Sequence, residues 1–304
     1  MEKRRSILII ANPTSNRGRG SRMADVVADG LRRMGVDVTV ELTNASGDAG
    51  MIAHEASTGP DVAHFCVAAC GGDGTIQEVA GALARRCVSG DADVPSLGLI
   101  PAGRCNDFAR ALGVPLDADG ITSVLAGGTP RPIDLGKVND RYFCTVATAG
   151  IDAEVSRFVD GMRLPLTGTP AYLYGAVRVL MGYEAPCMVI EGDFGRVEGR
   201  FFLASSANTS SYGGAIPIAP GAVPTDGLLD VCLIRAMSKL RAVSFVPIVL
   251  RGRHAKEPEV RLLKSKSLRI ESAKSIELWA DGEQIAETPA HIEIVPSAVR
   301  VLLP

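Results

Sequence analysis

AACGGDGTIQEVAGAL, residues 68–83, decides the fold of this 304-residue chain. An apolar run opens the stretch, GGDG follows at residues 71–74, and a helix-like pattern comes next. Glycines at the carboxyl end of a buried strand let backbone N–H groups approach an anion, and the start of a helix adds partial positive charge. The stretch therefore indicates a strand–loop–helix unit that binds phosphate, with a plain tight turn as the alternative.

Asp73 is unexpected in a loop that only binds phosphate, because its carboxylate would repel the anion. The arrangement makes sense if a magnesium ion lies between the two, or if the carboxylate faces a hydroxyl group. The chain contains no GxxxxGK[ST], GxGxxG or GxSxG motif. This absence removes the commonest phosphate-binding and esterase interpretations.

A second segment, GLIPAGRCNDFARALGVP at residues 98–115, repeats the design. A buried strand leads into a Pro-Gly turn and then into a polar helix start that carries Asn106 and Asp107. These two residues could be plain helix caps. However, ligands collect at the carboxyl edge of an open α/β sheet, so two glycine-bearing strand ends favour a shared ligand.

The hydrophobic pattern divides the chain near residue 134. Before it, strands and helices alternate as in an α/β domain. We expect strands at residues 6–11, 36–42, 63–69 and 96–100, and helices at residues 21–34, 49–57 and 75–83. The last of these helices is expected to open with a capping box formed by Thr75 and Glu78. After it, short β-like runs indicate a mostly antiparallel sandwich with helices near residues 171–182 and 239–250. Residues 128–134 are expected to form a turn-rich join.

Composition limits the function classes. The net charge of −2 and the low aromatic content of 5% argue against a nucleic-acid partner. Seven cysteines without a CxxC pair are typical of reduced core thiols in a cytosolic protein. The apolar run at residues 7–11 is too short for a signal peptide, and no run approaches the ~18 residues of a spanning helix. Any membrane contact is therefore expected to be peripheral.

Several segments together carry a family resemblance. In order and spacing, NPTSNRGRG (12–20), GGDGTIQEVAGAL (71–83) and IPAGRCNDFARALGVP (100–115) resemble the diacylglycerol kinase catalytic-domain family, the bacterial soluble lipid kinases in particular. IDLGKVNDRYFCTVATAGIDAEV (133–155), PGAVPTDGLLDVCLI (220–234) and ADGE (280–283) extend the resemblance over nearly the whole chain. GGDG alone is shared with NAD kinases and resembles the phosphofructokinase loop.

The resemblance implies an ATP- and Mg²⁺-dependent kinase that phosphorylates a lipid hydroxyl, with diacylglycerol as the default acceptor. It implies an NAD kinase- and phosphofructokinase-like parallel α/β domain over residues 1–133, to which residues 290–304 return, and a β-sandwich lipid-substrate domain over 134–289. The protein is then expected to be cytoplasmic and peripheral at the inner membrane face. Phosphatidylglycerol and sphingoid or ceramide-like lipids remain alternative acceptors, and a homodimer is left open.

The resemblance also implies roles for individual residues. The residues that would contact the nucleotide are Asn12, Gly71, Gly72, Gly74, Thr75, Arg104, Asn106 and Asp107. The catalytic residues would be Asp73, Asp134 and Glu283, with Glu283 as general base. The metal ligands would be Asp73, Asp134 and Asp226. Phosphoryl transfer depends mostly on positioning and charge neutralisation, and magnesium needs only one or two carboxylates besides phosphate oxygens. A lipid alcohol is a poor nucleophile, so a carboxylate such as Glu283 within hydrogen-bond reach would help.

Departures from the family pattern keep alternatives open. The family commonly has G-T-G-N-D where this chain has Gly103-Arg104-Cys105-Asn106-Asp107. Arg104 could clamp phosphate or obstruct the nucleotide, so a catalytically impaired nucleotide- or lipid-binding relative stays an alternative, as does an NAD kinase-like enzyme. Thr225 replaces a usual acid before Asp226, which weakens that metal site. The basic residues at 17, 19 and 22 either clamp phosphate or form a solvated surface.

Overall fold

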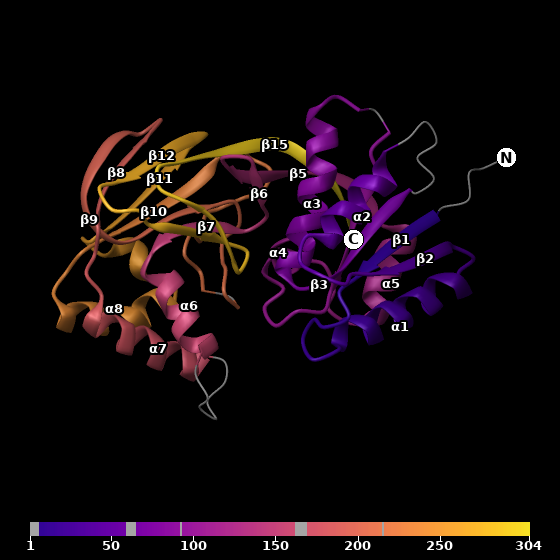
Figure 1. The fold of residues 1–304 in the computed structure, drawn as a ribbon, viewed down its shortest axis with the longest axis horizontal. Coiled ribbons are helices and arrows are strands. Elements are labelled where there is room, and N and C mark those ends of the chain that lie inside the picture. The colour runs from indigo at the N-terminus through magenta and orange to yellow at the C-terminus, as the bar shows by residue number, and fades with distance from the viewer. Residues whose placement is uncertain (1–5, 59–64, 92, 162–168, 215) are drawn as a thin grey trace. The chain divides into compact units, whose positions relative to one another are not determined.

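The computed structural model describes residues 6–58, 65–91, 93–161, 169–214 and 216–304 (Figure 1). The chain forms two compact units. The first comprises Met1–Leu135, Pro224–Asp226 and Val295–Pro304, and the second comprises Gly136–Val223 and Gly227–Ile294. The described part is an α/β domain followed by an antiparallel β-sandwich domain, as the sequence predicts.

The first unit contains a parallel sheet. Its strands lie in the order β2 (Asp37–Leu42), β1 (Ser6–Ala11), β3 (Cys66–Gly71) and β4 (Ser96–Pro101), and the end of β15 (Ala290–Leu303) pairs in parallel with β4. Every residue of β3 and β4 is buried. Strands covered on both faces have continuous apolar sequences, which explains the runs CVAAC and LGLI.

Helices cover both faces of this sheet (Figure 1). They are α1 (Arg19–Arg33), α2 (Asp48–Ser57), α3 (Asp73–Val88), α4 (Asp107–Ala111) and α5 (Ala118–Gly127). Ile7 and Ile9 of β1 pack with Val27 of α1 and Leu125 of α5 in one core cluster. Because parallel strands joined by such crossovers all point the same way, the loops after β1, β3 and β4 meet at one edge.

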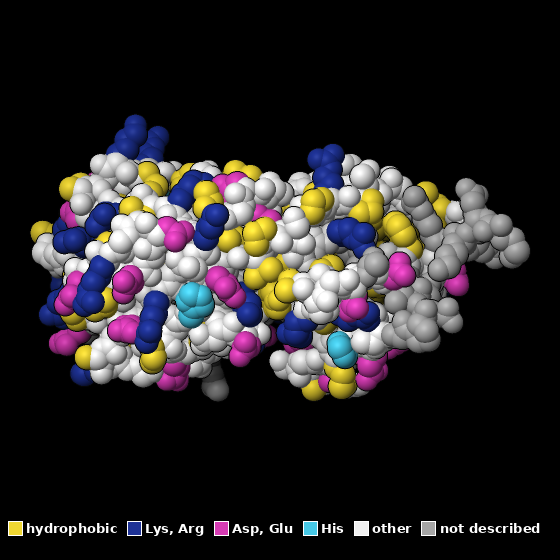
Figure 2. Space-filling view, turned by 90° about the horizontal axis from the view of Figure 1, so that it is seen from above, with side chains coloured by type: hydrophobic (Ala, Val, Ile, Leu, Met, Phe, Trp, Pro, Cys, Tyr) yellow, Lys and Arg dark blue, Asp and Glu magenta, His cyan; other side chains and the backbone are white. Residues whose placement is uncertain are grey.

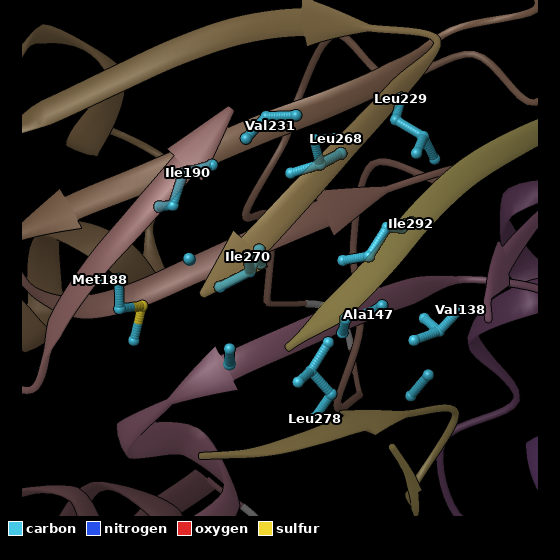
Figure 3. Packing of buried hydrophobic residues seen from close by; sticks show 14 of the residues in the cluster. Val138, Ala147, Met188, Ile190, Leu229, Val231, Leu268, Ile270, Leu278 and Ile292 are labelled. Carbon is cyan, nitrogen blue, oxygen red and sulfur yellow. The ribbon is translucent and has the colours of Figure 1, made fainter. Parts of the chain in front are cut away.

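The second unit is built from antiparallel strands: β7 (Val146–Gly150), β8 (Cys187–Gly192), β9 (Gly195–Ala207), β10 (Leu229–Arg235), β11 (Val260–Ser265), β12 (Ser267–Ser272), β13 (Glu277–Ala280) and β14 (Glu283–Glu287). One side has the order β14-β13-β7-β9-β10-β11, and long β9 also pairs with β8, which leads to β12. Figure 3 shows the apolar side chains that fill this sandwich, among them Met188, Ile270 and Leu278.

A second core cluster lies under helices α6 (Ile151–Gly161), α7 (Thr169–Gly182) and α8 (Lys239–Leu250). Here Leu180 of α7 and Phe245 of α8 pack with Phe202 of β9. The expected helices near 171–182 and 239–250 are therefore present, and α6 is additional. On the face of this unit in Figure 2, described basic and acidic side chains are interspersed.

Two local expectations were wrong. The segment at residues 128–134 is not a turn-rich join, because it enters the strand β5 (Thr129–Val138), which pairs with β15 and with β6 (Arg141–Phe143). Pro130 and Pro132 are two residues apart, so the N–H groups that they lack would lie on the same edge of β5. The N–H groups of the other residues can still pair.

The capping box at the start of α3 is also wrong. The helix begins at Asp73, two residues before Thr75, and its N-cap is Gly72, which has no side chain to accept a capping hydrogen bond. The Glu78 carboxylate instead accepts hydrogen bonds from the N–H groups of Gly47 (2.8 Å) and Gly50 (3.3 Å) at the start of α2. Glu78 therefore caps the neighbouring helix, a long-range contact that the local pattern does not encode.

Candidate active site

Three loops of the first unit touch at the carboxyl edge of its sheet. The N–H of Ala102, after β4, donates to the carbonyl of Gly71 at the end of β3 (2.8 Å). The loop after β1 joins them through Ser15 Oγ, which donates to the Ala102 carbonyl (3.4 Å), and Asn16 Nδ2, which donates to the Gly103 carbonyl (3.4 Å). The two glycine-bearing segments singled out in the sequence therefore form one surface with the loop that follows Asn12.

Asn12 organises the first of these loops. Its Oδ1 accepts hydrogen bonds from the N–H (3.0 Å) and the hydroxyl (2.8 Å) of Thr14, and its Nδ2 donates to Thr75 Oγ1 (3.4 Å). A Cβ atom on Gly20 would lie 2.1 Å from the Asn12 carbonyl oxygen, so α1 starts in close contact with this residue. Asn12 and Thr75 thus connect the loops after β1 and β3, and their contact with nucleotide stays a prediction.

Two glycines of these loops are required by close packing, Gly71 against the Thr75 side chain and Gly103 against backbone. A Cβ on Gly71 would lie 2.5 Å from Thr75 Oγ1, and one on Gly103 would lie 2.5 Å from the Cα of Gly72. A Cβ on Gly72 itself would meet its nearest atom at 3.6 Å. Gly71 and Gly103 therefore cannot carry a side chain unless a loop moves. This steric requirement for glycine holds even when no ligand is bound.

Asp73 and Asp107 bring two carboxylates close together, each at the first residue of a helix. Burial and the neighbouring Asp107 raise the pKa of Asp73 to about 6, although hydrogen bonds from the N–H groups of Phe108, Asn106 and Asp107 act to lower it. The Phe108 N–H donates to Asp73 Oδ1 at 3.3 Å. A buried carboxylate beside a second one has an excess of negative charge, and a divalent cation with oxygen ligands fits such a donor set.

Asn106 supports the loop rather than capping α4. It has a left-handed backbone (φ 56°) and is buried; its Oδ1 accepts from the Gly103 N–H (2.8 Å), and its Nδ2 donates to the Gly103 carbonyl (3.2 Å). Burial, followed by Asp107 and Asp73, raises the pKa of the Cys105 thiol to about 11. Arg104 beside it is exposed. The two unusual residues therefore lie next to the carboxylate pair.

Asp134 is buried on β5, with 3% of its surface exposed. Its Oδ1 accepts from the N–H of Ser297 on β15 (2.7 Å), and its own N–H donates to the Pro224 carbonyl (2.9 Å). Asp226 follows in the same short segment and is exposed. Among the residues described, no group of three or more His, Cys, Asp or Glu side chains could hold a metal, so metal binding by Asp134 and Asp226 stays a prediction.

Glu283 lies in the second unit, at the start of β14. It follows Asp281 and Gly282, whose φ angles of 51° and 90° form the kind of hairpin turn that Asp-Gly favours. The Glu283 side chain is 38% exposed, and its Oε2 lies 3.6 Å from Arg141 Nη2. Arg141 also donates to the Gln284 carbonyl (3.0 Å). The carboxylate is thus accessible and held on a short hairpin, whose register shifts between Leu278 and Trp279.

Asp281 was missed by the sequence analysis. Its carboxylate accepts hydrogen bonds from the N–H groups of Cys144 (2.6 Å) and Thr145 (2.9 Å) and from the Thr145 hydroxyl. These bonds fix the hairpin that carries Glu283 against the start of β7. The Asp-Gly pair signalled a turn, but its partners lie more than 130 residues away and have no local signature.

The second unit also contains an apolar cavity of about 100 Å³. Helices α6, α7 and α8 and strands β9 and β10 line it, with Leu180, Phe202 and Phe245 among its walls. In the expected helix near 171–182, the side chains at 171–173 lie outside the described residues; Tyr183 is buried in the core and Tyr174 is exposed. No described helix has the length and hydropathy needed to cross a membrane.

Comparison with known proteins agrees with this architecture. Residues 6–138 match the family model "Diacylglycerol kinase catalytic domain", and residues 145–303 match "YegS C-terminal NAD kinase beta sandwich-like domain". A solved structure of a putative diacylglycerol kinase from Bacillus anthracis has the same fold, with a TM-score of 0.81 and 23% identity over 100% of this chain and 98% of that one.

Curated relatives extend the match over the full chain. The diacylglycerol kinase of Mycobacterium tuberculosis H37Rv is 30% identical over 98% of this chain and 95% of its own length. The diacylglycerol kinase of Bacillus subtilis 168 is 30% identical over 97% and 95%. With both units matched in order and a relative aligned from end to end, the chain belongs to the diacylglycerol kinase family of lipid kinases.

Proposed function

We propose that this protein transfers the γ-phosphoryl group of ATP, with Mg²⁺, to the hydroxyl of a lipid for which diacylglycerol is the default. The observation that carries the proposal is a pair of acidic residues at the edge of the parallel sheet, the partly buried Asp73 and the buried Asp107. In a family of lipid kinases, such a negative site beside glycine-rich loops suits a metal-bound triphosphate.

The first unit would be the nucleotide-binding domain. The loop after Asn12, residues 71–75 and the segment from Arg104 to Asp107 would surround the phosphates, and Asp73 would hold the metal. When bound, magnesium neutralises charge that develops on the phosphoryl oxygens. Asp134 supports this region through its bond to Ser297, and Asp226 is a further proposed ligand.

The second unit would bind the lipid and supply the base. The Glu283 carboxylate would accept the proton of the lipid hydroxyl as that oxygen attacks, a contribution typically worth about 10²- to 10⁴-fold in rate. Asp281 and Arg141 keep its hairpin in place. Because Asp73 and Glu283 belong to different units, their action on one substrate pair is the central part of the proposal.

The apolar cavity would receive a lipid chain, since apolar walls exclude water from the acyl group. A lipid substrate resides in a bilayer, so the protein would act in the cytoplasm as a peripheral protein at the inner membrane face.

One assay tests the proposal directly. Labelled ATP and Mg²⁺ are supplied with mixed micelles of diacylglycerol, phosphatidylglycerol or a ceramide, and in parallel with NAD as a soluble acceptor. Lipid-linked label supports the proposal; label on NAD alone overturns it in favour of an NAD kinase-like enzyme. Nucleotide binding without any product, together with a gain of activity in the variant Arg104→Thr/Cys105→Gly, would identify an impaired relative.

A further inference from the structure

The apolar cavity of the second unit contains one charged group among its described lining residues, Asp152. Asp152 is the second residue of α6, and 7% of its surface is exposed. The other described walls are aliphatic or aromatic, apart from the hydroxyl of Tyr212. A carboxylate in such surroundings needs a reason, because burying a charge without full pairing is costly.

The hydrogen bonding of Asp152 is incomplete. Interactions with the Thr148 side chain and with the N–H groups at the start of α6 act to lower its pKa, but burial dominates and raises it to about 6. Oxygen Oδ1 has no hydrogen-bond partner among the described residues. Buried polar atoms are usually satisfied, and an exception at a cavity wall indicates a missing ligand group.

The surroundings of Asp152 connect it with the proposed base. Thr148 is opposite Trp279 in the ladder between β7 and β13, and Thr148 Oγ1 donates to the Trp279 carbonyl (3.3 Å). The hairpin that presents Glu283 begins two residues after Trp279. Asp152 therefore lies next to the strand pair that leads into the Glu283 hairpin.

We propose that Asp152 is a specificity-determining residue that binds a hydrogen-bond donor on the lipid, beside the chain that fills the cavity. This inference rests on the proposed function and replaces its default acceptor, diacylglycerol, with a lipid that has a second hydrogen-bond donor. Diacylglycerol has a single O–H, which is the group to be phosphorylated, and its ester groups only accept hydrogen bonds. The ligand that satisfies Asp152 carries a second donor: an amide or amine N–H, as in a ceramide or sphingoid lipid.

The test compares two short-chain lipids with the full-length protein: 1,2-dioctanoylglycerol and its amide analogue N,O-dioctanoylserinol, in which N–H replaces one ester oxygen and the chains and the single hydroxyl stay the same. Binding is measured without ATP by equilibrium dialysis of tritiated lipid, and kcat/KM is measured with labelled ATP. The variants are Asp152→Asn, which keeps the shape, and Asp152→Leu, which removes the hydrogen-bonding group. Glu154→Gln is the matched control, because Glu154 is an exposed acid on the same helix.

We expect wild type to bind the amide lipid at least about ten-fold more tightly than the diester, since an unpaired buried charge disfavours the latter. Asp152→Leu should abolish this preference by weakening the amide lipid about ten-fold while changing the diester less than three-fold, and Glu154→Gln should preserve it. Equal binding of both lipids by wild type, or an unchanged preference in Asp152→Leu, overturns the inference. If neither lipid is phosphorylated, the proposed kinase function fails, whereas the binding preference still decides the role of Asp152.

Discussion

The carboxylate of Asp281 accepts a hydrogen bond from the backbone N–H of Thr145 at 2.9 Å, and a second from the hydroxyl of the same residue. These two residues are far apart in the chain, yet they fix the turn that immediately precedes Glu283. Asp281 thus has a positioning role, and the accessible Glu283 has the proposed chemical one.

Replacing Asp281 separates these two roles. Asp281→Ala removes bonds to two backbone N–H groups and one hydroxyl, and we expect a loss of about 2–3 kcal/mol in the free energy of unfolding, typical of partly buried charge-assisted bonds. The kcat for lipid phosphorylation should fall at least ten-fold while the KM for ATP stays unchanged. Asp281→Asn should recover part of both losses, and equal kcat in Asp281→Ala and wild type would remove the positioning role.

Gly103 tests whether contact between the two glycine-bearing loops is necessary. Gly103→Ala places a methyl group 2.5 Å from the Cα of Gly72, so one loop must shift. We expect at least a ten-fold rise in the dissociation constant of Mg·ATP, measured by calorimetry. Gly127→Ala is the matched control, because a Cβ there meets nothing within 4 Å and alanine is favoured in a helix; nucleotide binding unaffected by Gly103→Ala would contradict the expectation.

Asp73 gives the protein a defined pH dependence. Its pKa is raised to about 6 by burial and by Asp107, so below pH 6 the carboxyl is protonated and cannot hold a cation. We expect kcat/KM to fall about ten-fold per pH unit below this midpoint, and higher Mg²⁺ to shift the midpoint downward because metal favours the charged form. If the pH midpoint of kcat/KM does not change with Mg²⁺ concentration, metal binding by Asp73 is contradicted.

The raised pKa of Asp73 also makes the folded protein less stable as the pH rises. In the folded protein Asp73 holds its proton more tightly than in the unfolded chain, where the pKa is near 3.8. Its contribution to stability is therefore full below about pH 4 and is lost as pH rises through 6, by about 2–3 kcal/mol. Asp73→Asn should remove this loss, as measured by urea unfolding at pH 4 and pH 8, and an unchanged pH dependence would show that Asp73 is not perturbed.

Glu78 tests the cap that replaced the expected capping box. Glu78→Ala deletes the acceptor for the N–H groups of Gly47 and Gly50, and we expect a loss of about 1 kcal/mol in the free energy of unfolding. Thr75→Ser keeps the hydroxyl that accepts the hydrogen bond from Asn12 Nδ2, so it should lower the free energy of unfolding less than Glu78→Ala does. If Glu78→Ala is as stable as wild type, the contact with α2 contributes nothing.

The regular parts of the fold were predictable because their signals are local. The runs SILIIA, CVAACG and SLGLIP are continuous apolar segments of strand length, and each lies in a parallel strand. The antiparallel sandwich followed from short alternating runs such as that of β12. Continuous apolar runs thus mark strands buried on both faces, and alternating runs mark strands that bury one face.

The remainder depends on long-range contacts that no local pattern contains. Asp281 and Glu78 act on backbone groups of distant segments, and the role of Asp134 toward Ser297 joins residues 163 positions apart. Asp152 was part of a family-like segment but gave no signal of its own, because its significance arises from the helices that enclose it. For Asp73 and Asp107, proximity to each other was suggested by the shared sheet edge, whereas the burial of Asp107 and the raised pKa of Asp73 required the structure.

The most direct test of joint action by Asp73 and Glu283 is a double-mutant cycle on single-turnover phosphoryl transfer from labelled ATP to lipid. We expect Asp73→Asn and Glu283→Gln each to reduce the rate at least about 100-fold, and the double variant to be about as slow as the slower single one, because residues that serve one step are not additive. Wild-type rates in both single variants, or fully additive losses in the double variant, would contradict action of the two carboxylates in a single transfer step.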